Sequence, residues 1–288
     1  MASTHPSFLD LISLTDGRDG TAVAPRSPEE AGRTYGGLLL AQAVAAARRT
    51  VEPDRAIHSL HAMFLRPGDV DAPTRYAVET IRDGRSFSAR QVSADQHGPE
   101  VFRMLASYQV PEEGLTYQAD EGIDVASLPG PDEAPVDYAA YTYAMIDGPP
   151  GSWPGEVRPI DIRYLNPPEG RTGPPNTDDQ LMWMRIVGDL PENPAVHEAA
   201  LAYLADATLV DHVLLPHGYR WQDERFDGTS LDHAMWFHRP ARADTWLLYH
   251  QRVAGTGGAR GMVIGRFHTP DGTLVASCGQ EGLMRWNG

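Results

Sequence analysis

The feature that most constrains the fold is a short motif that the chain contains twice, as HAMFLRP at residues 61–67 and as HAMWFHRP at residues 233–240. Each copy is followed, in the same order, by an Ala-Arg pair, a turn that contains Gly, and an Ala-Ser pair. Arg66 and Arg239 are 173 residues apart, far more than the period of a solenoid repeat. The sequence therefore predicts two domains of similar fold joined in one chain.

Each half is also predicted to contain one helix followed by four strands. Residues 35–49 (YGGLLLAQAVAAARR) predict a buried helix, and residues 195–215 predict a longer one. Turn signals separate strands, which are predicted at 57–65, 74–81, 86–95 and 100–110 and again at 231–238, 244–253, 259–268 and 273–285. Further strands are predicted at 8–14, 20–24, 156–165 and 181–190. The expected fold class is α+β, with an antiparallel sheet wrapped around each helix.

Proline separates the two halves. Residues 111–175 hold 12 of the 24 prolines, which fix φ and remove backbone donors. Regular structure is therefore expected to be sparse there, apart from a short helix near 138–145. We predict an N-terminal domain at 1–110, a Pro-rich connector at 111–155, and a C-terminal domain at 156–288 that carries the candidate site.

Composition excludes several classes of protein. No segment approaches the ~20 apolar residues that span a membrane, and the N-terminus lacks the features of a signal peptide. The one cysteine, Cys278, rules out an internal disulfide framework. The net charge is −15 and all 24 basic residues are Arg, which argues against general nucleic-acid binding. These observations favour a cytoplasmic protein.

One carboxylate lies where an apolar residue is expected. Helical spacing in the second helix places five residues on one stripe: Ala199, Tyr203, Asp206, Val210 and Val213. A carboxylate among apolar residues is costly unless it is hydrogen-bonded. Asp206 is therefore a candidate functional residue, with a structural Asp satisfied by a neighbouring polar group as the alternative.

Cys278 and Gln280 share one face of the last predicted strand because side chains alternate along a strand. A lone Cys in an Ala-rich strand is usually a small buried residue, so a nucleophilic Cys278 is the weaker alternative. The chain has no G-x-S-x-G, H-E-x-x-H or C-x-x-C motif. His233 and His238 are five residues apart on a predicted strand and are expected on opposite faces. We predict no metal and no cofactor.

Five ordered blocks then resemble one family: YGGLLLAQAV, HAMFLRPGD, RDGRSFSARQV, LDHAMWFHRP and QEGLMRW. They resemble the type II acyl-CoA thioesterases, the TesB family, from about residue 30 to residue 286. The resemblance implies an enzyme with two fused hot-dog domains that hydrolyses fatty acyl-CoA to fatty acid and CoA. It also implies a homodimer or tetramer.

The resemblance implies three catalytic residues, namely Asp206, Ser230 and Gln280. We expect Asp206 to act as general base on a water that Ser230 and Gln280 hold. Gly36 and Gly37, at the start of the first helix, are candidate oxyanion donors, with tight helix packing as the alternative.

Arg82 and Arg90 are candidate contacts for the CoA phosphates, although a structural role fits either one. Two other functions stay open: a non-catalytic acyl-CoA-binding module, and a hot-dog hydratase or dehydratase acting on acyl thioesters. The sequence leaves open the acyl chain length and whether the thioester is carried by CoA or by a carrier protein.

Overall fold

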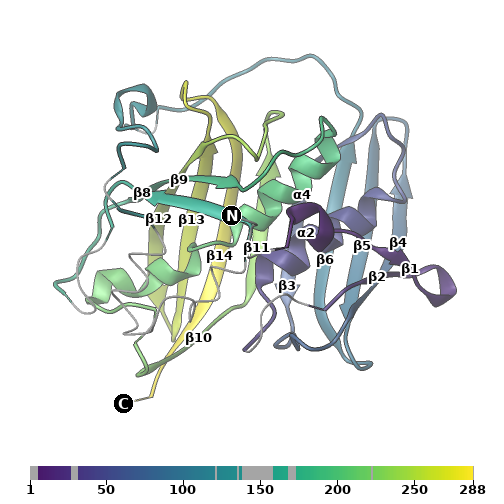
Figure 1. Ribbon diagram of the computed structural model, residues 1–288, viewed down its shortest axis with the longest axis horizontal. Coiled ribbons are helices and arrows are strands. Elements are labelled where there is room, and N and C mark those ends of the chain that lie inside the picture. The colour runs from purple at the N-terminus through teal and green to yellow at the C-terminus, as the bar shows by residue number, and fades with distance from the viewer. Residues whose placement is uncertain are drawn as a thin grey trace.

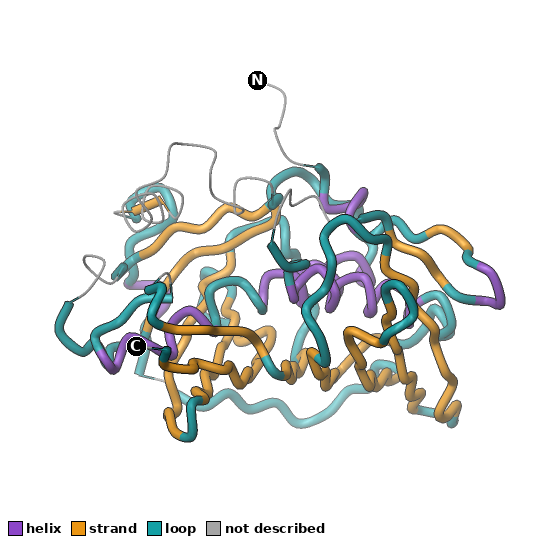
Figure 2. The backbone as a smooth tube through the Cα atoms, turned by 90° about the horizontal axis from the view of Figure 1, so that it is seen from below, coloured by secondary structure: helices purple, strands orange, loops and turns teal. Residues whose placement is uncertain are grey.

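The computed structural model describes residues 6–26, 32–120, 122–134, 136–137, 158–167, 173–221 and 223–287. One antiparallel sheet of 14 strands curves around two central helices, α2 (Gly36–Arg48) and α4 (Pro194–Ala205). Figure 1 shows the two helices side by side across the middle of the molecule, and Figure 2 shows strands lying on both sides of them. The apolar core fills the space between these helices and the inner face of the sheet.

The strands fall into two sets of similar order. In the first half, the strands are β1 (Thr15–Asp16), β2 (Ala22–Ala24), β3 (Ala56–Phe64), β4 (Thr74–Asp83), β5 (Phe87–Asp95) and β6 (Glu100–Gln109). In the second half, they are β7 (Val136–Asp137), β8 (Ile160–Tyr164), β9 (Gln180–Ile186), β10 (Phe226–Ser230), β11 (Asp232–Phe237), β12 (Leu247–Gly257), β13 (Arg260–His268) and β14 (Leu274–Trp286). Outward from the centre the order is β3-β6-β5-β4-β2 on one side and β11-β14-β13-β12-β9 on the other.

The repeated motif lies at the centre of the sheet, where β3 and β11 pair and join the two halves. The two copies pair with each other, since His61 lies opposite Ala234 and Ala62 opposite His233. Directly opposed residues share a face of the sheet. The motif copies are therefore one residue out of phase: His233 is buried on the inner face, whereas His61 is exposed on the outer face.

The helices α2 and α4 form where expected for local reasons. Ala and Leu dominate α2, which is buried along most of its length. The helix α4 begins at Pro194, and the side chain of its N-cap Asn193 accepts a hydrogen bond from the Ala195 amide. The N-terminus of α2 meets the C-terminus of α4, since the Gly37 amide bonds to Asp206.

Two predicted elements were wrong. Residues 8–14 do not form a strand, because Ser7 caps a short helix, α1 (Phe8–Leu11), that buries Phe8 and Leu11 on one side. The helix predicted over 195–215 ends at its C-cap Asp206, and Thr208 has a φ of 64°, which no α-helix continues through.

A 3₁₀ helix, η4 (Val210–His217), follows that break. In the described part of the chain, 3₁₀ segments also occur at η1 (Arg18–Gly20) and η2 (Val125–Ser127). The helical stretch Pro194–His217 is long and apolar enough to cross a membrane by length and composition alone. However, 89% of its most apolar 18-residue segment is buried inside the protein, as in a core helix. The short helix expected near 138–145 lies outside the described residues.

Candidate active site

The three residues implied by the family resemblance come together in the structure. The Gln280 Nε2 atom lies 2.7 Å from Asp206 Oδ1 and 2.6 Å from Ser230 Oγ, and donates to both. Asp206 is at the end of α4, Ser230 ends β10, and Gln280 lies within β14. The sheet brings them together because β10 pairs along β14, with Ser230 opposite Gly282.

The Asp206 carboxylate is buried, and each of its two oxygens accepts one hydrogen bond. Its Oδ2 accepts the Gly37 amide proton over 2.8 Å, and its Oδ1 accepts from Gln280. The Gly37 amide is in the first turn of α2, where the helix dipole favours a negative charge. A carboxylate with two donors keeps lone pairs on both oxygens that are free for a further hydrogen bond.

The two glycines allow α2 and the end of α4 to approach each other. A Cβ atom on Gly36 would lie 2.8 Å from Asp206 Oδ2, and one on Gly37 would lie 2.5 Å from the Tyr203 carbonyl oxygen. Because the Gly37 amide already donates to Asp206, it does not serve an oxyanion in this arrangement. Of the two predicted donors, Gly36 is the one that lines the pocket.

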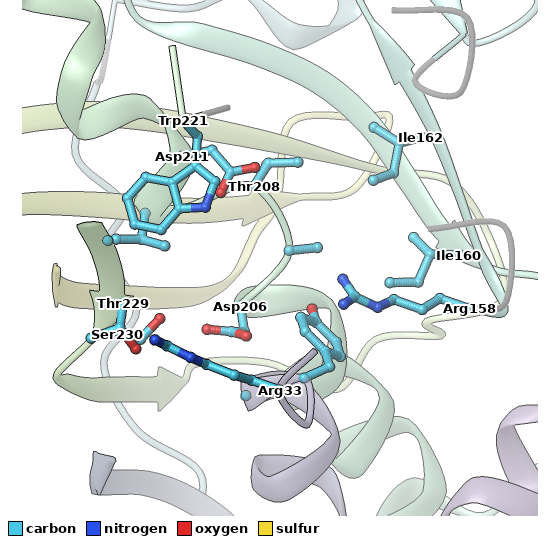
Figure 3. Close-up of a pocket in the computed structure, with 15 residues that line it drawn as sticks. Arg33, Arg158, Ile160, Ile162, Asp206, Thr208, Asp211, Trp221, Thr229 and Ser230 are labelled. Atoms are coloured by element: carbon cyan, nitrogen blue, oxygen red, sulfur yellow. The ribbon is translucent and has the colours of Figure 1, made fainter. Parts of the chain in front are cut away.

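A pocket of about 260 Å³ opens beside Asp206 and Ser230. Figure 3 shows that its wall combines carboxylates and hydroxyls with the apolar side chains of Ile160, Ile162 and Trp221. Gln280 does not line the pocket and is fully buried behind it. Its two amide protons are both taken, so Gln280 acts on its neighbours and not on a molecule in the pocket.

His233 extends the hydrogen-bond network of Asp206, Ser230 and Gln280 on the side of Gln280 away from the pocket. The Nδ1 atom of His233 lies 3.0 Å from the Gln280 carbonyl oxygen Oε1. Sequence reasoning considered His233 only as a metal ligand and missed this contact. The signal that could have found it is the D-H pair directly after Ser230-Leu231, within the repeated motif.

The two arginines predicted to meet CoA phosphates do not lie at the pocket. Arg90 is buried and its guanidinium bonds to Asp83 and to Thr50, beyond the C-terminal end of α2. Arg82 is exposed on β4, and its carbonyl oxygen accepts from Arg90. Both residues are therefore at the end of α2 opposite to Gly36.

Two other arginines line the pocket, and the sequence alone gave no sign of them. Figure 3 shows Arg33 reaching toward Ser230 and Asp206, with Arg158 on the other side of the opening. The Arg158 guanidinium lies 3.8 Å from the centroid of the Tyr35 ring. This stacking holds the cation at the pocket wall.

Cys278 is unsuited to nucleophilic attack. Burial raises the pKa of its thiol to about 12, and the thiol contacts the Tyr249 hydroxyl at 3.1 Å. Since the thiolate is the nucleophilic form, a thiol with this pKa is inert at neutral pH. Among the described residues, no cluster of three His, Cys, Asp or Glu side chains is arranged to hold a metal ion.

Two family models match the chain. The model for acyl-CoA thioesterase matches residues 161–283, and the model for the acyl-CoA thioesterase N-terminal domain matches residues 24–109. Acyl-coenzyme A thioesterase 8 of Mus musculus is 36% identical over 264 residues, which is 88% of this chain and 80% of that protein. The match therefore extends over most of both sequences.

Comparison with solved structures identifies the fold. The acyl-CoA thioesterase II TesB2 of Mycobacterium marinum superposes with a TM-score of 0.75 and 34% identity, over 97% of each chain. A hot-dog fold protein of unknown function from Alicyclobacillus acidocaldarius superposes with a TM-score of 0.74 at 20% identity, over 96% of this chain and 97% of that one. The latter likeness concerns the fold alone. The chain adopts the hot-dog fold and belongs to the acyl-CoA thioesterase family of the TesB type.

Proposed function

We propose that this enzyme hydrolyses acyl-CoA thioesters to a free acid and CoA, and that the reaction takes place beside Asp206. Membership of the acyl-CoA thioesterase family supports the reaction. The observation that carries the site is the convergence of Asp206, Ser230 and Gln280 at the edge of one pocket. These three residues come from separate elements. An Asp with only a structural role would not need both Ser230 and Gln280 beside it.

The reaction proceeds by direct attack of water on the thioester carbon. Asp206 takes the proton from the attacking water, using the lone pairs that Gly37 and Gln280 leave free. The Ser230 oxygen already accepts from Gln280, so its own proton is available to orient that water. Gln280 holds the carboxylate and the hydroxyl at a fixed separation and does not itself meet the water.

The oxyanion that develops on the thioester oxygen needs a donor within the pocket. The amide of Gly36 lies at the N-terminus of α2, where the free N–H groups and the helix dipole favour negative charge. The tetrahedral intermediate then collapses with cleavage of the C–S bond, which releases the carboxylic acid, and the proton held by Asp206 passes to the departing CoA thiolate. No covalent acyl-enzyme forms on this route.

The CoA phosphates are assigned to the arginines at the pocket opening. Arg33 and Arg158 line that opening and present guanidinium groups, which bind phosphate oxygens through paired N–H donors. They replace Arg82 and Arg90 in this role. If Arg33 contacts a phosphate, an Arg33→Ala variant should have a higher KM for CoA thioesters, with kcat little changed.

We propose that the chain is divided into two hot-dog domains, 1–110 and 156–288, joined by a connector at 111–155. The similar order of strands on the two sides of the β3–β11 pair supports this division. So do the two family models, which match separate halves of the chain.

We propose a cytoplasmic homodimer or tetramer. Apolar side chains on the outer face of the central strands, including Met63, Leu105 and Trp236, are exposed in the single chain and would be covered in such an assembly. Sedimentation equilibrium distinguishes a monomer from these assemblies.

The proposed reaction is tested by measuring thiol release from acyl-CoAs of short, medium and long chain, with wild type and Ser230→Ala side by side. Release at one preferred chain length, reduced in the variant, is the expected result. Binding of acyl-CoA without release would favour the binding module. Hydration of an enoyl-CoA without release would favour the hydratase. A labelled acyl group that stays on the protein after acid quenching would replace direct water attack by a covalent intermediate.

A further inference from the structure

His233 is turned toward the site by the phase difference between the two copies of the repeated motif. In the first copy, His61 points outward and stacks edge-to-face on Trp236, with ring centroids 5.4 Å apart. In the second copy, His233 points inward and is 1% exposed. A shift of one residue in a strand moves every side chain to the other face. The same motif therefore places a histidine at the surface in one half and behind the pocket in the other.

The hydrogen bond to Gln280 fixes which ring nitrogen of His233 carries a proton. The Oε1 atom of an amide only accepts, so His233 Nδ1 must donate across the 3.0 Å contact. Burial lowers the pKa of His233, while the charge of Asp206 acts in the opposite direction. The ring is thus a neutral donor, and among the described residues its Nε2 has no hydrogen-bond partner.

The Asp206 carboxylate, which only accepts, and the His233 donor together decide which way the Gln280 amide faces. With Oε1 held by His233, Nε2 must face Asp206 Oδ1 and Ser230 Oγ. The flipped amide would place Oε1 against the carboxylate of Asp206 and would turn two donors toward His233. A lone pair against a buried carboxylate is strongly unfavourable, so one orientation prevails as long as the Nδ1 proton is present.

A buried imidazole with an unpaired Nε2 lowers the stability of the fold. An apolar residue at this core position, on the strand between β3 and β14, would not carry that cost. The Ala62 side chain, directly opposite on β3, shows that the inner face accepts such a residue. The histidine is therefore explained by the one hydrogen bond that its Nδ1 makes, and not by packing.

We propose that His233 is a positioning residue for the hydrolysis: through Gln280 it holds Asp206 and Ser230 in the arrangement that acts on water. It does not line the pocket beside Asp206. The chain of contacts runs from the His233 Nδ1–H to Gln280 Oε1, and from Gln280 Nε2 to Asp206 and Ser230. This inference rests on the proposed function, since it assumes that Asp206 and Ser230 carry the reaction.

The test compares variants at position 233 by steady-state kinetics of thiol release. His233→Leu and His233→Phe remove the donor, and the second keeps a ring of similar shape. His233→Asn places an amide N–H near the position of Nδ1. We expect both apolar variants to lower kcat by about tenfold or more with KM within about twofold, and His233→Asn to recover most of kcat.

Two matched controls separate positioning from general destabilisation. His61→Leu changes the same residue in the other copy of the motif, on the outer face. Met235→Ala opens a cavity two residues along the same buried face of β11, and should lower Tm with little change in kcat. A double variant of His233→Leu and Gln280→Leu should be no slower than Gln280→Leu alone, because His233 acts through that residue.

Several results would overturn the proposal. Wild-type kcat in His233→Leu or His233→Phe would do so, as would a His233→Asn variant as slow as these, or independent effects in the double variant. Asp206→Asn is measured alongside. If Asp206→Asn keeps wild-type activity, the proposed site itself is wrong. If it loses activity while His233→Phe keeps it, only the role of His233 fails.

Discussion

Replacing Gln280 with Glu offers a sharp test of the network, because the two side chains have nearly the same shape. The substitution exchanges the Nε2 donor, 2.7 Å from Asp206 Oδ1, for a carboxylate oxygen. Two unit charges at that distance repel by roughly 6 kcal/mol at an effective dielectric constant of 20. The pair avoids this repulsion by binding one proton, so its apparent pKa lies above that of an ordinary carboxylic acid.

The bound proton has two measurable consequences. First, kcat/KM at pH 7 should fall by at least about a hundredfold, because the shared proton occupies the base, and any remaining activity should rise toward higher pH. Second, the free energy of unfolding should depend on pH. A carboxyl pKa raised in the folded state gives stability that is present below the unfolded pKa, near 4, and lost as pH rises through the folded pKa.

The assay is urea unfolding of wild type, Gln280→Glu and Gln280→Leu at pH 5 and pH 8, together with the pH profile of thiol release. The difference in stability between Gln280→Glu and wild type should grow from pH 5 to pH 8. The difference for Gln280→Leu, which adds no charge, should stay constant. A Gln280→Glu variant with the kinetics and pH dependence of wild type would refute the contact between Gln280 and Asp206.

Three further predictions follow from single contacts. In Gly36→Ala the added Cβ, 2.8 Å from Asp206 Oδ2, should displace the carboxylate and lower kcat about tenfold or more, and Tm should fall in thermal melts because the same Cβ also meets the Phe64 ring at 3.0 Å. Burial raises the pKa of Glu198 to about 7, so the free energy of unfolding of wild type should fall as pH rises from about 4.5 to 7. In urea unfolding, Glu198→Gln should be as stable as wild type at pH 5 and more stable than wild type by roughly 2 kcal/mol at pH 8. Cys278→Ser should keep activity, and native protein should resist thiol labelling until it is unfolded, whereas rapid labelling would contradict the buried thiol.

The strands and the helix α2 were predictable because their signals are local. The alternation of apolar and polar residues and the strong turn residues placed seven of the eight predicted core strands within three residues of their observed bounds. The Ala- and Leu-rich composition identified α2. Residues 8–14 were misassigned, since their short apolar run suits either a strand or a helix and the cap by Ser7 decided it. The end of α4 at Asp206 was missed because that break is stabilised by contacts with distant residues.

The candidate site was predictable only in part for the same reason. Asp206 stood out as a carboxylate among apolar residues, and the resemblance supplied Ser230 and Gln280. The role of the Gly37 amide depends on the packing of α2 against α4, which no local pattern reports. The inward turn of His233 depends on the register between β3 and β11. Both require the folded chain.

The measurement that tests the central claim most directly is the kcat of Asp206→Asn for the preferred acyl-CoA at pH 7. Asparagine offers one acceptor oxygen where the carboxylate offers two, so the fold of the variant is first verified by its circular dichroism and Tm. A folded variant with kcat reduced at least about a hundredfold is what a general base at Asp206 predicts. A folded variant that keeps more than half of the wild-type kcat would contradict the account.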